Sequence, residues 1–369
     1  MSDPENFLTI IFMTSLFIQL MYHWRVFQKL PLATINSPQT NPQPVSVLIA
    51  ARNEEENLPR LLKALKQQKY PFYEVIVIND RSDDGTATVL EEFSKHFSKL
   101  KTISITEVPD DWTGKKNAIK QGIDASSHEL LLFTDADCYP KSESWIAEMT
   151  SNFESGIDIV LGFSPYREAP TVLNQFIRFE TLHTGLLYLS HALAGRPYMG
   201  VGRNMAYRKA LFEKAGFAGD EKYTGGDDDI FVNRHANKKN AKVVLSEDSQ
   251  MVSIPEISWA AYLKQKIRHL SVGKRYHKKD KTSLANFSLA TLVGWILFIY
   301  LLLVVENKAL ILVPFAVRSW SFYSIFTRSG QKLKVKLAYW ALPLFDLCYT
   351  ISYPVVGLIA LTAKRIKWS

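Results

Sequence analysis

Long apolar segments lie near both ends of this chain, and a polar middle region separates them. Residues 7–22 carry no charged side chain, and Arg25 and Lys29 follow them directly. Because a helix needs about 20 apolar residues to cross a bilayer, this segment predicts a membrane helix. A cleaved signal peptide would have basic residues ahead of the apolar run and a small-residue cleavage site behind it, and neither pattern is present. We therefore expect residues 1–30 to form a retained membrane anchor.

The last third of the chain repeats this apolar pattern. Its runs cover residues 284–305, about 308–326 and about 335–361. Together with the anchor they predict about four membrane segments, about three of them within 284–362, around one soluble domain at 44–280. The final run contains Pro343, Asp346 and Pro354, so it either crosses the membrane or forms a hairpin that does not cross.

Two ionisable residues, Arg318 and Asp346, fall inside these C-terminal runs. Placing either charge in a bilayer costs about 2.5 to 3.5 kcal/mol, so both side chains should face protein or water. They are expected to form either a buried pair or part of a channel for an acceptor molecule.

The positions of basic residues predict which side of the membrane the soluble domain occupies. Arg25 and Lys29 follow the first apolar segment, and further basic residues precede the second: Lys274, Arg275, Lys278, Lys279 and Lys281. Since segments rich in lysine and arginine stay in the cytoplasm, the soluble domain is expected there, at a bacterial plasma membrane. After three further crossings, Lys364, Arg365 and Lys367 would lie outside, unless the last run is a hairpin.

The formal net charge of +8 does not predict a nucleic-acid-binding protein. The basic residues cluster beside the apolar runs instead of forming a basic face interleaved with aromatic residues. Anionic membrane lipids and a small anionic substrate account for them better. The two cysteines, Cys138 and Cys348, provide no disulfide framework, which fits a reducing compartment.

The soluble domain alternates strand-like and helix-like segments. Residues 45–51 and 75–78 are apolar runs of strand length, and leucines at helical spacing lie between them. The turn sequence NDRSDDGT leads into a helix, and the strand TISITEV, a helix near 116–125 and the strand LLLFTDAD follow. This order predicts an α/β fold with a parallel sheet and helices on both faces. In the segment 201–217, a glycine and a polar pair are expected to precede an amphipathic helix. This arrangement would either shape a sugar pocket or form a turn of the chain.

Polar clusters follow three of the predicted strands at their carboxyl ends, where ligands bind in such sheets. These clusters are Arg52, Asn53 and Glu54; Asn79 and Asp80; and Asp135 and Asp137. Alternate residues of a strand point the same way, so Asp135 and Asp137 are expected to converge on one divalent cation. Such a cation neutralises charge on a diphosphate leaving group. An isolated Asp-x-Asp is more often a turn or a helix cap, but its place after an apolar strand in this fold favours the metal site.

Two further motifs carry charged side chains suited to chemistry. TGGDDDIF places Asp227, Asp228 and Asp229 before an apolar helix, and at most one or two of them can face a site. One such carboxylate is suited to act as a general base, although acids also favour helix N-termini for the dipole alone. GKKNAIKQGI places Lys115 and Lys116 at a helix entrance, where they meet a docked anion or remain solvated surface lysines.

A basic amphipathic segment at 258–279 contains Trp259 and Tyr262 and predicts a helix at the membrane surface. Gln265 and Arg268 share one face of that helix, so Arg268 is expected to reach a diphosphate or a lipid headgroup. The sequence contains neither cysteine–histidine pairs at zinc-ligand spacing nor a Gly-x-Ser-x-Gly nucleophile motif.

Residues 44–280 resemble the family 2 glycosyltransferases, which are inverting, membrane-associated enzymes with the GT-A fold, a Rossmann-like fold for nucleotide-diphospho-sugar transfer. The group includes ceramide glucosyltransferase and cellulose and hyaluronan synthases. The resemblance rests on VSVLIAARNEEENL, VIVINDRSDDGT, GKKNAIKQGI, TDAD, GGDDDIF and QKIRH. It implies an α/β glycosyltransferase domain in the cytoplasm, joined to α-helical membrane segments.

The resemblance also implies which residues bind the nucleotide sugar. They are Ala51, Arg52, Glu54, Asp80, Lys115, Asp135, Gln265 and Arg268. Within this set, Asp80 is implied to contact the base, usually uracil, and Lys115 matches the family's Gly-Lys element.

The same resemblance implies that one acidic motif binds the metal and the other accepts the proton. Asp137, supported by Asp135, is the implied ligand of Mg2+ or Mn2+. The family's usual Glu-Asp pair reads Gly-Asp in GGDDDIF, so Asp227 is the implied base and Asp228 the alternative register. QKIRH has His269 where the family has tryptophan, so the acceptor-stacking role stays unassigned and a long-chain polysaccharide synthase is less favoured.

Together with this resemblance, these residues predict an inverting glycosyltransferase. A nucleotide-diphosphate sugar, expected to be a UDP-hexose, would donate its sugar to a lipid, lipid-linked or polysaccharide acceptor at the cytoplasmic membrane face. Two alternatives remain: a non-catalytic sugar-nucleotide-binding component of envelope polysaccharide assembly, and a nucleotidyltransferase. The first would show a broken acidic set, whereas both acidic motifs are intact here. The second usually has a glycine-rich loop after its first strand, and AARNEEEN has no glycine.

Overall fold

The computed structural model describes residues 3–35, 42–217 and 219–362, and the chain divides into two compact units. The helical unit comprises Met1–Ala33, Pro170–Ala194 and Ile257–Ala363, and the α/β unit comprises Thr34–Ala169 and Gly195–Glu256. This division assigns residues 170–194 and 257–280 to the helical unit, although the sequence pattern groups them with the soluble domain.

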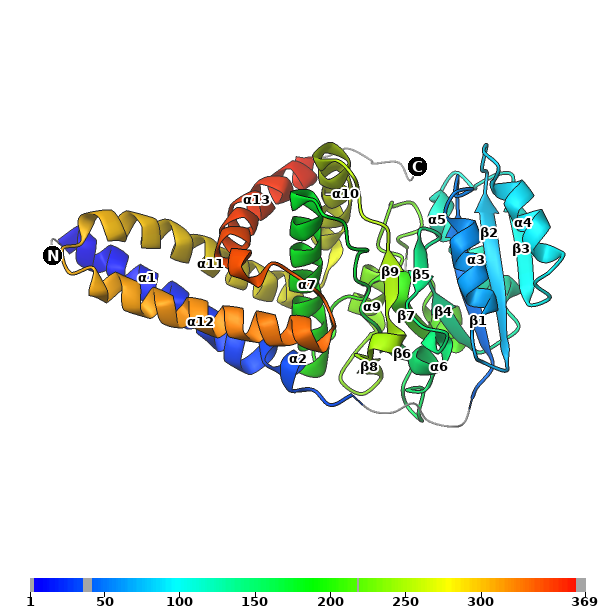
Figure 1. The fold of residues 1–369 in the computed structure, drawn as a ribbon, viewed down its shortest axis with the longest axis horizontal. Coiled ribbons are helices and arrows are strands. Elements are labelled where there is room, and N and C mark those ends of the chain that lie inside the picture. Colours follow the sequence, from blue (N-terminus) through cyan, green and yellow to red (C-terminus); the bar gives the residue numbers. More distant parts are fainter. Residues whose placement is uncertain (1–2, 36–41, 218, 363–369) are drawn as a thin grey trace. The chain divides into compact units, whose positions relative to one another are not determined.

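The α/β unit is built, within the described ranges, on a seven-stranded sheet with the order β3-β2-β1-β4-β7-β6-β8 (Figure 1). Its strands are β1 (Val45–Ala51), β2 (Tyr73–Asp80), β3 (Leu100–Ile105), β4 (Leu130–Phe133), β6 (Ile159–Leu161), β7 (Met205–Arg208) and β8 (Ala241–Val243). The first four run parallel, whereas β7 runs antiparallel to both β4 and β6. A second, antiparallel pair consists of β5 (Cys138–Pro140) and β9 (Met251–Ser253).

The sheet confirms the expected α/β fold class and corrects the expectation of a wholly parallel sheet. Residues 205–208, expected to begin an amphipathic helix, form β7, and α8 (Lys209–Ala215) follows. Met205, Ala206 and Tyr207 are buried because this short strand lies inside the sheet, between β4 and β6.

Apolar side chains at alternate strand positions build the core of the α/β unit. Val47 and Ile49 of β1 and Val75 and Val77 of β2 are buried in one cluster with the leucines of α3 (Leu58–Lys66). The remaining helices of this unit are α4 (Thr86–Ser94), α5 (Gly114–Ala125), α6 (Trp145–Thr150), η2 (Gly202–Asn204), α9 (Asp229–His235) and η3 (Glu247–Ser249). Each fully buried leucine or valine stabilises such a core by about 1.5 to 3 kcal/mol. This core fixes the strands and therefore the positions of their carboxyl ends.

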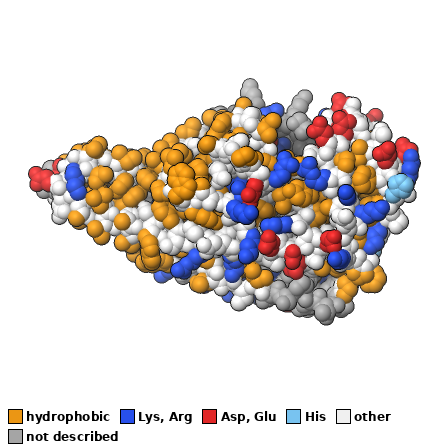
Figure 2. All heavy atoms as spheres, viewed as in Figure 1, with side chains coloured by type: hydrophobic (Ala, Val, Ile, Leu, Met, Phe, Trp, Pro, Cys, Tyr) orange, Lys and Arg blue, Asp and Glu red, His pale blue; other side chains and the backbone are white. Residues whose placement is uncertain are grey.

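The helical unit contains the apolar runs. Its helices are α1 (Asp3–Tyr22), η1 (His23–Phe27), α2 (Lys29–Leu32), α7 (Val172–Leu193), α10 (Trp259–Val272), η4 (Gly273–Arg275), α11 (Lys278–Val304), α12 (Ala309–Lys332), η5 (Tyr339–Ala341) and α13 (Leu342–Thr362). Four described helical segments are long and apolar enough to cross a membrane: Pro4–Leu32, Lys278–Val304, Ala309–Lys332 and Tyr339–Ala360. Figure 2 shows many apolar side chains on the visible surface of these helices, and exposed examples are Leu289, Ile296, Val313 and Trp320. This composition supports association with a membrane.

The last apolar run forms one helix, so the hairpin alternative for it is wrong. Pro343 stands in the first turn of α13, where proline costs no internal hydrogen bond, and Pro354 lies within the helix. Lys364, Arg365 and Lys367 lie outside the described residues.

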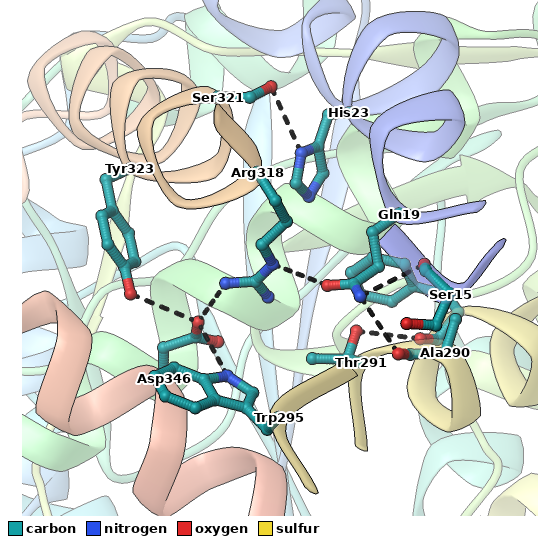
Figure 3. Close-up of polar contacts among 11 residues, drawn as sticks. Ser15, Gln19, His23, Ala290, Thr291, Trp295, Arg318, Ser321, Tyr323 and Asp346 are labelled. Carbon is teal, nitrogen blue, oxygen red and sulfur yellow. Dashed lines mark hydrogen bonds and ion pairs between the residues drawn. The ribbon is translucent and has the colours of Figure 1, made fainter. Parts of the chain in front are cut away.

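A buried polar network links the apolar helices (Figure 3). Arg318 Nη1 of α12 lies 2.6 Å from Asp346 Oδ2 of α13, which confirms the buried pair. Arg318 Nε donates to Gln19 Oε1 of α1 at 2.6 Å, and Gln19 Nε2 donates to Ala290 O of α11 at 3.0 Å. Trp295 Nε1 of α11 also donates to Asp346. The network therefore connects α1, α11, α12 and α13.

Candidate active site

The loop after β1 and the loop after β2 are tied together by hydrogen bonds. Asn53 N donates to Ser82 Oγ at 2.9 Å, and Asp83 N donates to Asn53 Oδ1 at 2.9 Å. Asn53 has a positive φ of 56°, which asparagine tolerates better than most residues. The loop that carries Arg52 and Glu54 is therefore held in one conformation at the carboxyl end of the sheet.

Asp135 and Asp137 lie in the turn between β4 and β5, not on a strand as expected from the sequence. Strand β4 ends at Phe133, and Cys138 N donates to Asp135 O at 3.2 Å to close the turn. Both aspartates are partly exposed, whereas Ala136 between them is buried. The turn therefore leaves both carboxylates accessible, although the reason is not strand alternation.

Carboxylates from these loops repel one another. Burial, together with repulsion from Asp137 and Asp135, raises the pKa of Glu54 to about 7, against the effect of a hydrogen bond from Asn57. Burial and the neighbouring Asp135 also raise the pKa of Asp137. Like charges held close together in a folded protein favour the binding of a cation, which reduces their repulsion.

A pocket lies at the same end of the sheet. It is small and partly open, with a cavity volume of about 20 Å3. Its polar lining includes Lys115, Asp135, Gly202, Tyr207, Asp227 and Asp228. The structure thus brings the Gly-Lys element, one aspartate of the TDAD motif and two acids of GGDDDIF, Asp227 and Asp228, to a single cavity.

Lys115, in the first turn of α5, joins the two acidic motifs. Its Nζ lies 2.9 Å from Asp135 Oδ1 and 3.2 Å from Asp227 Oδ2. Burial alone would lower the pKa of Lys115, but Asp135 and Asp227 outweigh it and raise that pKa above its ordinary value. The lysine therefore stays charged, and its ammonium group is shared by two carboxylates.

The two candidate bases are held differently. Asp228 accepts hydrogen bonds from Gly202 N at 2.6 Å and from Asp229 N at 2.7 Å. These bonds engage both of its oxygens and fix the start of α9, while burial raises the pKa of Asp228. Asp227 is 8% exposed and contacts Lys115 through Oδ2. This arrangement favours Asp227 for proton transfer and Asp228 for holding the backbone.

The other residues expected at the site are more dispersed. Asp80, at the end of β2, is fully buried, and Arg81 donates to its two oxygens at 2.8 and 3.0 Å. Ala51, the last residue of β1, is also buried. Gln265 and Arg268 lie on α10 of the helical unit, so they are not among the residues that the α/β unit itself brings together.

The segment at 201–208 contributes more than the sequence indicates, because Gly202, Met205 and Tyr207 line the pocket. A Cβ on Gly202 would come within 3.1 Å of Asp228 Oδ2, so a side chain there would disturb the bond that fixes α9. The signal that the sequence offers is Gly202, which stands shortly before the apolar run of Met205, Ala206 and Tyr207.

Comparison with known families identifies the chain. A model of glycosyl transferase family 2 matches residues 46–216, and a model of glycosyl transferase family group 2 matches residues 137–353, which is more than half of the chain. The chain belongs to the family 2 glycosyltransferases.

Curated relatives of this family 2 glycosyltransferase come from several bacteria. The probable glycosyltransferase YdaM of Bacillus subtilis is 32% identical over 197 residues, 51% of this chain and 46% of that protein. The poly-beta-1,6-N-acetyl-D-glucosamine synthase of Staphylococcus epidermidis is 28% identical over 192 residues, 50% and 44% respectively. The beta-monoglucosyldiacylglycerol synthase of Nostoc sp. is 36% identical over 101 residues, 27% and 21%. The chain spans less than half the length of each of these relatives.

A solved structure supports the same architecture. The mannosyltransferase PcManGT from Pyrobaculum calidifontis, in complex with GDP-Man and Mn2+, has a TM-score of 0.63. The match covers 96% of this chain and 98% of that chain at 17% identity. At this identity the likeness shows the fold, and it agrees with the GT-A fold expected for a family 2 glycosyltransferase.

The turn after β4 fits a divalent cation. Mg2+ is usually bound by one or two carboxylates, with waters and substrate phosphates completing its coordination. Asp135 and Asp137 supply hard oxygen ligands, and the pKa of Glu54 is raised chiefly by burial and further by the charges of Asp137 and Asp135. Among residues 3–35, 42–217 and 219–362, no three His, Cys, Asp or Glu side chains form a complete metal site.

Proposed function

We propose that this family 2 glycosyltransferase moves a sugar from a nucleotide-diphosphate sugar to a hydroxyl group of an acceptor. The observation that carries the proposal is the pocket in which Lys115 contacts both Asp135 and Asp227. Asp135 belongs to the motif proposed to hold a metal, and Asp227 belongs to the motif proposed to hold the base. The ammonium group of Lys115 thus contacts both the proposed metal-binding motif and the proposed base.

The donor is proposed to bind over the carboxyl ends of β1, β2 and β4, where ligands bind in such sheets. Ala51, Arg52 and Glu54 would contact the nucleotide at the end of β1, and Asp80 would contact the base at the end of β2. A UDP-hexose is the proposed donor. GDP-sugars are the second class to test, because the fold neighbour PcManGT was solved with GDP-Man.

Asp137, with Asp135 in support, is proposed to hold Mg2+ or Mn2+. The bound cation supplies positive charge that offsets the negative charge on the departing diphosphate. Lys115 adds a second positive charge from α5, and the raised pKa of that lysine keeps it protonated. Gln265 and Arg268 of α10 remain proposed donor-binding residues on the basis of the family resemblance alone.

Asp227 is proposed to accept the proton of the acceptor hydroxyl as the hydroxyl oxygen attacks the anomeric carbon. The bond between that carbon and the donor phosphate oxygen breaks on the opposite face, so the configuration inverts and the nucleoside diphosphate leaves. The 3.2 Å contact with Lys115 orients the Asp227 carboxylate. Asp228 fixes the helix that follows through its bond to Gly202.

The acceptor is proposed to be a lipid, a lipid-linked molecule or a polysaccharide at the cytoplasmic membrane face. The four apolar helical segments support a membrane setting, and Arg25 and Lys29 beside the first segment support a cytoplasmic domain. The names of two relatives, a beta-monoglucosyldiacylglycerol synthase and a poly-beta-1,6-N-acetyl-D-glucosamine synthase, provide one precedent for a lipid acceptor and one for a polysaccharide.

The test is a transfer assay with protein purified in detergent. Radiolabelled UDP-sugars and GDP-sugars are supplied with bacterial lipid extract, and labelled product and released nucleotide are measured. We expect labelled lipid or glycan together with free UDP or GDP. Asp137→Ala should lower turnover by about 100-fold or more, whereas the exposed surface control Asp124→Ala should not.

Other outcomes of this assay separate the alternatives. Release of pyrophosphate would identify a nucleotidyltransferase. Tight donor binding with no product from any acceptor fraction would identify a non-catalytic binding component. Full turnover in Asp137→Ala would show that the metal role assigned to Asp137 is wrong.

A further inference from the structure

Lys116, the residue after Lys115, is fully buried in the α/β unit. Its Nζ donates hydrogen bonds to Asp220 O at 2.6 Å and to Tyr223 O at 2.9 Å, and lies 5.6 Å from the centre of the Phe217 ring. An ammonium group removed from water is costly to the fold unless acceptors replace the water. Lys116 is therefore a buried anchor, and the surface-lysine alternative for it is wrong.

Two nearby residues hold the same stretch of chain. Thr113 N, directly before α5, donates to Glu221 O at 2.9 Å. The Trp112 ring meets the Phe217 ring edge-on, with centroids 6.0 Å apart. The start of α5 and the residues before it therefore contact residues 217–223 through both the backbone and a side chain of that stretch.

The stretch anchored by Lys116 leads directly to the proposed base. Thr224, Gly225 and Gly226 separate Tyr223 from Asp227, and the two glycines have positive φ values of 74° and 81°. Glycine adopts such values without strain, so the pair turns the chain sharply. Glycine also restricts the backbone least, so the position of Asp227 depends on what holds the chain on either side of the pair.

Both sides of the acidic motif are held. After the motif, Asp228 fixes the start of α9 through its bond to Gly202 N. Before the motif, the Asp220 carbonyl is bound by Lys116, and the Asp220 carboxylate forms an ion pair with Arg234 of α9 at 2.7 Å. The backbone that carries the acids is thus fixed at two ends.

We propose that Lys116 is a positioning residue for the transfer reaction, because its hold on the carbonyls of Asp220 and Tyr223 sets where Asp227 stands against Lys115. Adjacent residues of a helix point about 100° apart, so the two lysines reach different targets from one turn of α5. Lys115 contacts the Asp227 carboxylate, and Lys116 holds the backbone that precedes it. The inference rests on the proposed function, in which Asp227 is the base.

The kinetic test compares Lys116→Met, which removes the ammonium group but keeps the aliphatic chain, with Lys120→Met. Lys120 lies one turn later on α5, where it is exposed and pairs with Asp124. Turnover is measured per enzyme molecule that binds UDP with Mn2+, so misfolded protein is not counted. We expect Lys116→Met to lower kcat by about 100-fold at unchanged UDP affinity, because small displacements of a catalytic group are costly. Lys116→Arg should recover most of that loss, and Lys120→Met should match the wild type.

Limited trypsin digestion reports the anchor without using activity. Lys222 is exposed and lies between the two anchored carbonyls, so cleavage after it requires this stretch to detach. We expect cleavage after Lys222, followed by mass spectrometry, to be faster in Lys116→Met than in the wild type or Lys120→Met.

Four results would overturn the proposal. An active wild type with an unchanged kcat in Lys116→Met, or with UDP affinity falling by the same factor as kcat, overturns the positioning role alone. Equal rates of cleavage after Lys222 overturn the anchor. A wild type that transfers no sugar from any donor overturns the proposed function and the positioning role together.

Discussion

Each of the two units holds a basic side chain between acceptor oxygens, but the two clusters differ in charge and in access. In the helical unit, Arg318 pairs with Asp346, and these side chains are 1% and 4% exposed. In the α/β unit, Lys115 contacts Asp135 and Asp227, and its side chain is 24% exposed. The first cluster balances one positive charge with one negative charge and is sealed. The second sets one positive charge against two negative charges beside an open pocket.

This difference separates a cluster that assembles a fold from one that receives a ligand. In a balanced pair that is closed to solvent, each charge is already neutralised by its partner, so the pair does not attract a ligand. Removal of one partner leaves the other charge buried. A cluster with surplus acid is stabilised when a cation joins it. Glu54 lies close to these acids: burial, and to a lesser extent the charges of Asp137 and Asp135, raise its pKa to about 7.

The largest expected effect distinguishes the two acids of the pocket. Asp227→Asn keeps the shape of the side chain and removes the proposed base, so kcat should fall by about 10^2- to 10^4-fold while thermal stability changes little. Asp228→Ala removes the acceptor of two backbone hydrogen bonds and should lower the free energy of unfolding by about 1 to 2 kcal/mol. Transfer kinetics and thermal unfolding in detergent measure these effects. An active Asp227→Asn beside a folded but inactive Asp228→Ala would reverse the assignment.

The second prediction concerns the sealed pair. Arg318→Met leaves the Asp346 carboxylate without its partner among apolar helices, so the free energy of unfolding should fall by about 3 to 5 kcal/mol. Turnover per folded molecule should remain close to that of the wild type. The double variant with the two charges exchanged should regain part of the lost stability in a thermal unfolding assay. A double variant no more stable than the weaker single variant would show that the two residues do not act as a pair.

The third prediction removes the shared cation of the open cluster. Lys115→Met frees Asp135 and Asp227 from their contact with the ammonium group. Affinity for Mn2+, measured by calorimetry, should rise because Asp135 no longer binds a competing cation. Turnover should nevertheless fall by about 10- to 100-fold, since the charge that supports the leaving diphosphate is lost. Weaker Mn2+ binding would contradict the surplus of acid in this cluster.

The smallest expected effect is a pH dependence. The pKa of Glu54 is raised from 4.5 to about 7, so its ionisation disfavours the folded state as pH increases through that window. The metal-free protein should therefore lose stability from this group between about pH 4.5 and 7, and Glu54→Gln should reduce the loss. Because a nearby cation stabilises the ionised form of Glu54, Mn2+ affinity should rise by about tenfold from pH 5.5 to pH 8 in the wild type and less in Glu54→Gln. An identical pH profile in both proteins would exclude Glu54 as the source.

The sequence predicts the first half of the α/β unit because its signals are local. Residues 45–51 and 75–78 are continuous apolar runs, and they form the buried strands β1 and β2. Strand β7 is short and depends on partners far away in the chain, such as the pairing of Ala206 with Leu132 and with Val160. No local pattern reveals those partners, so an antiparallel strand in the middle of the sheet could not be predicted.

The candidate site shows the same limit. The acids and Lys115 stand out as motifs, but the contact of Lys115 with Asp227 joins two distant segments of the chain. The burial of Lys116 likewise depends on the backbone carbonyls of a distant stretch. The pair of Arg318 and Asp346 was more predictable, because an apolar helix leaves an isolated charge few favourable positions.

Helix α7 lies between β6 and β7 in the sequence, and this order affects how the chain folds during its synthesis. These strands are paired, at Ile159 with Tyr207 among others, yet α7 is made between them. Phe179 of α7 packs against Phe326 of α12 and Phe345 of α13, which are synthesised after α7. The growing chain must therefore carry an apolar helix whose partners do not yet exist. A chain truncated before α12 would leave the apolar face of α7 around Phe179 uncovered, and exposed apolar surface of this kind favours aggregation.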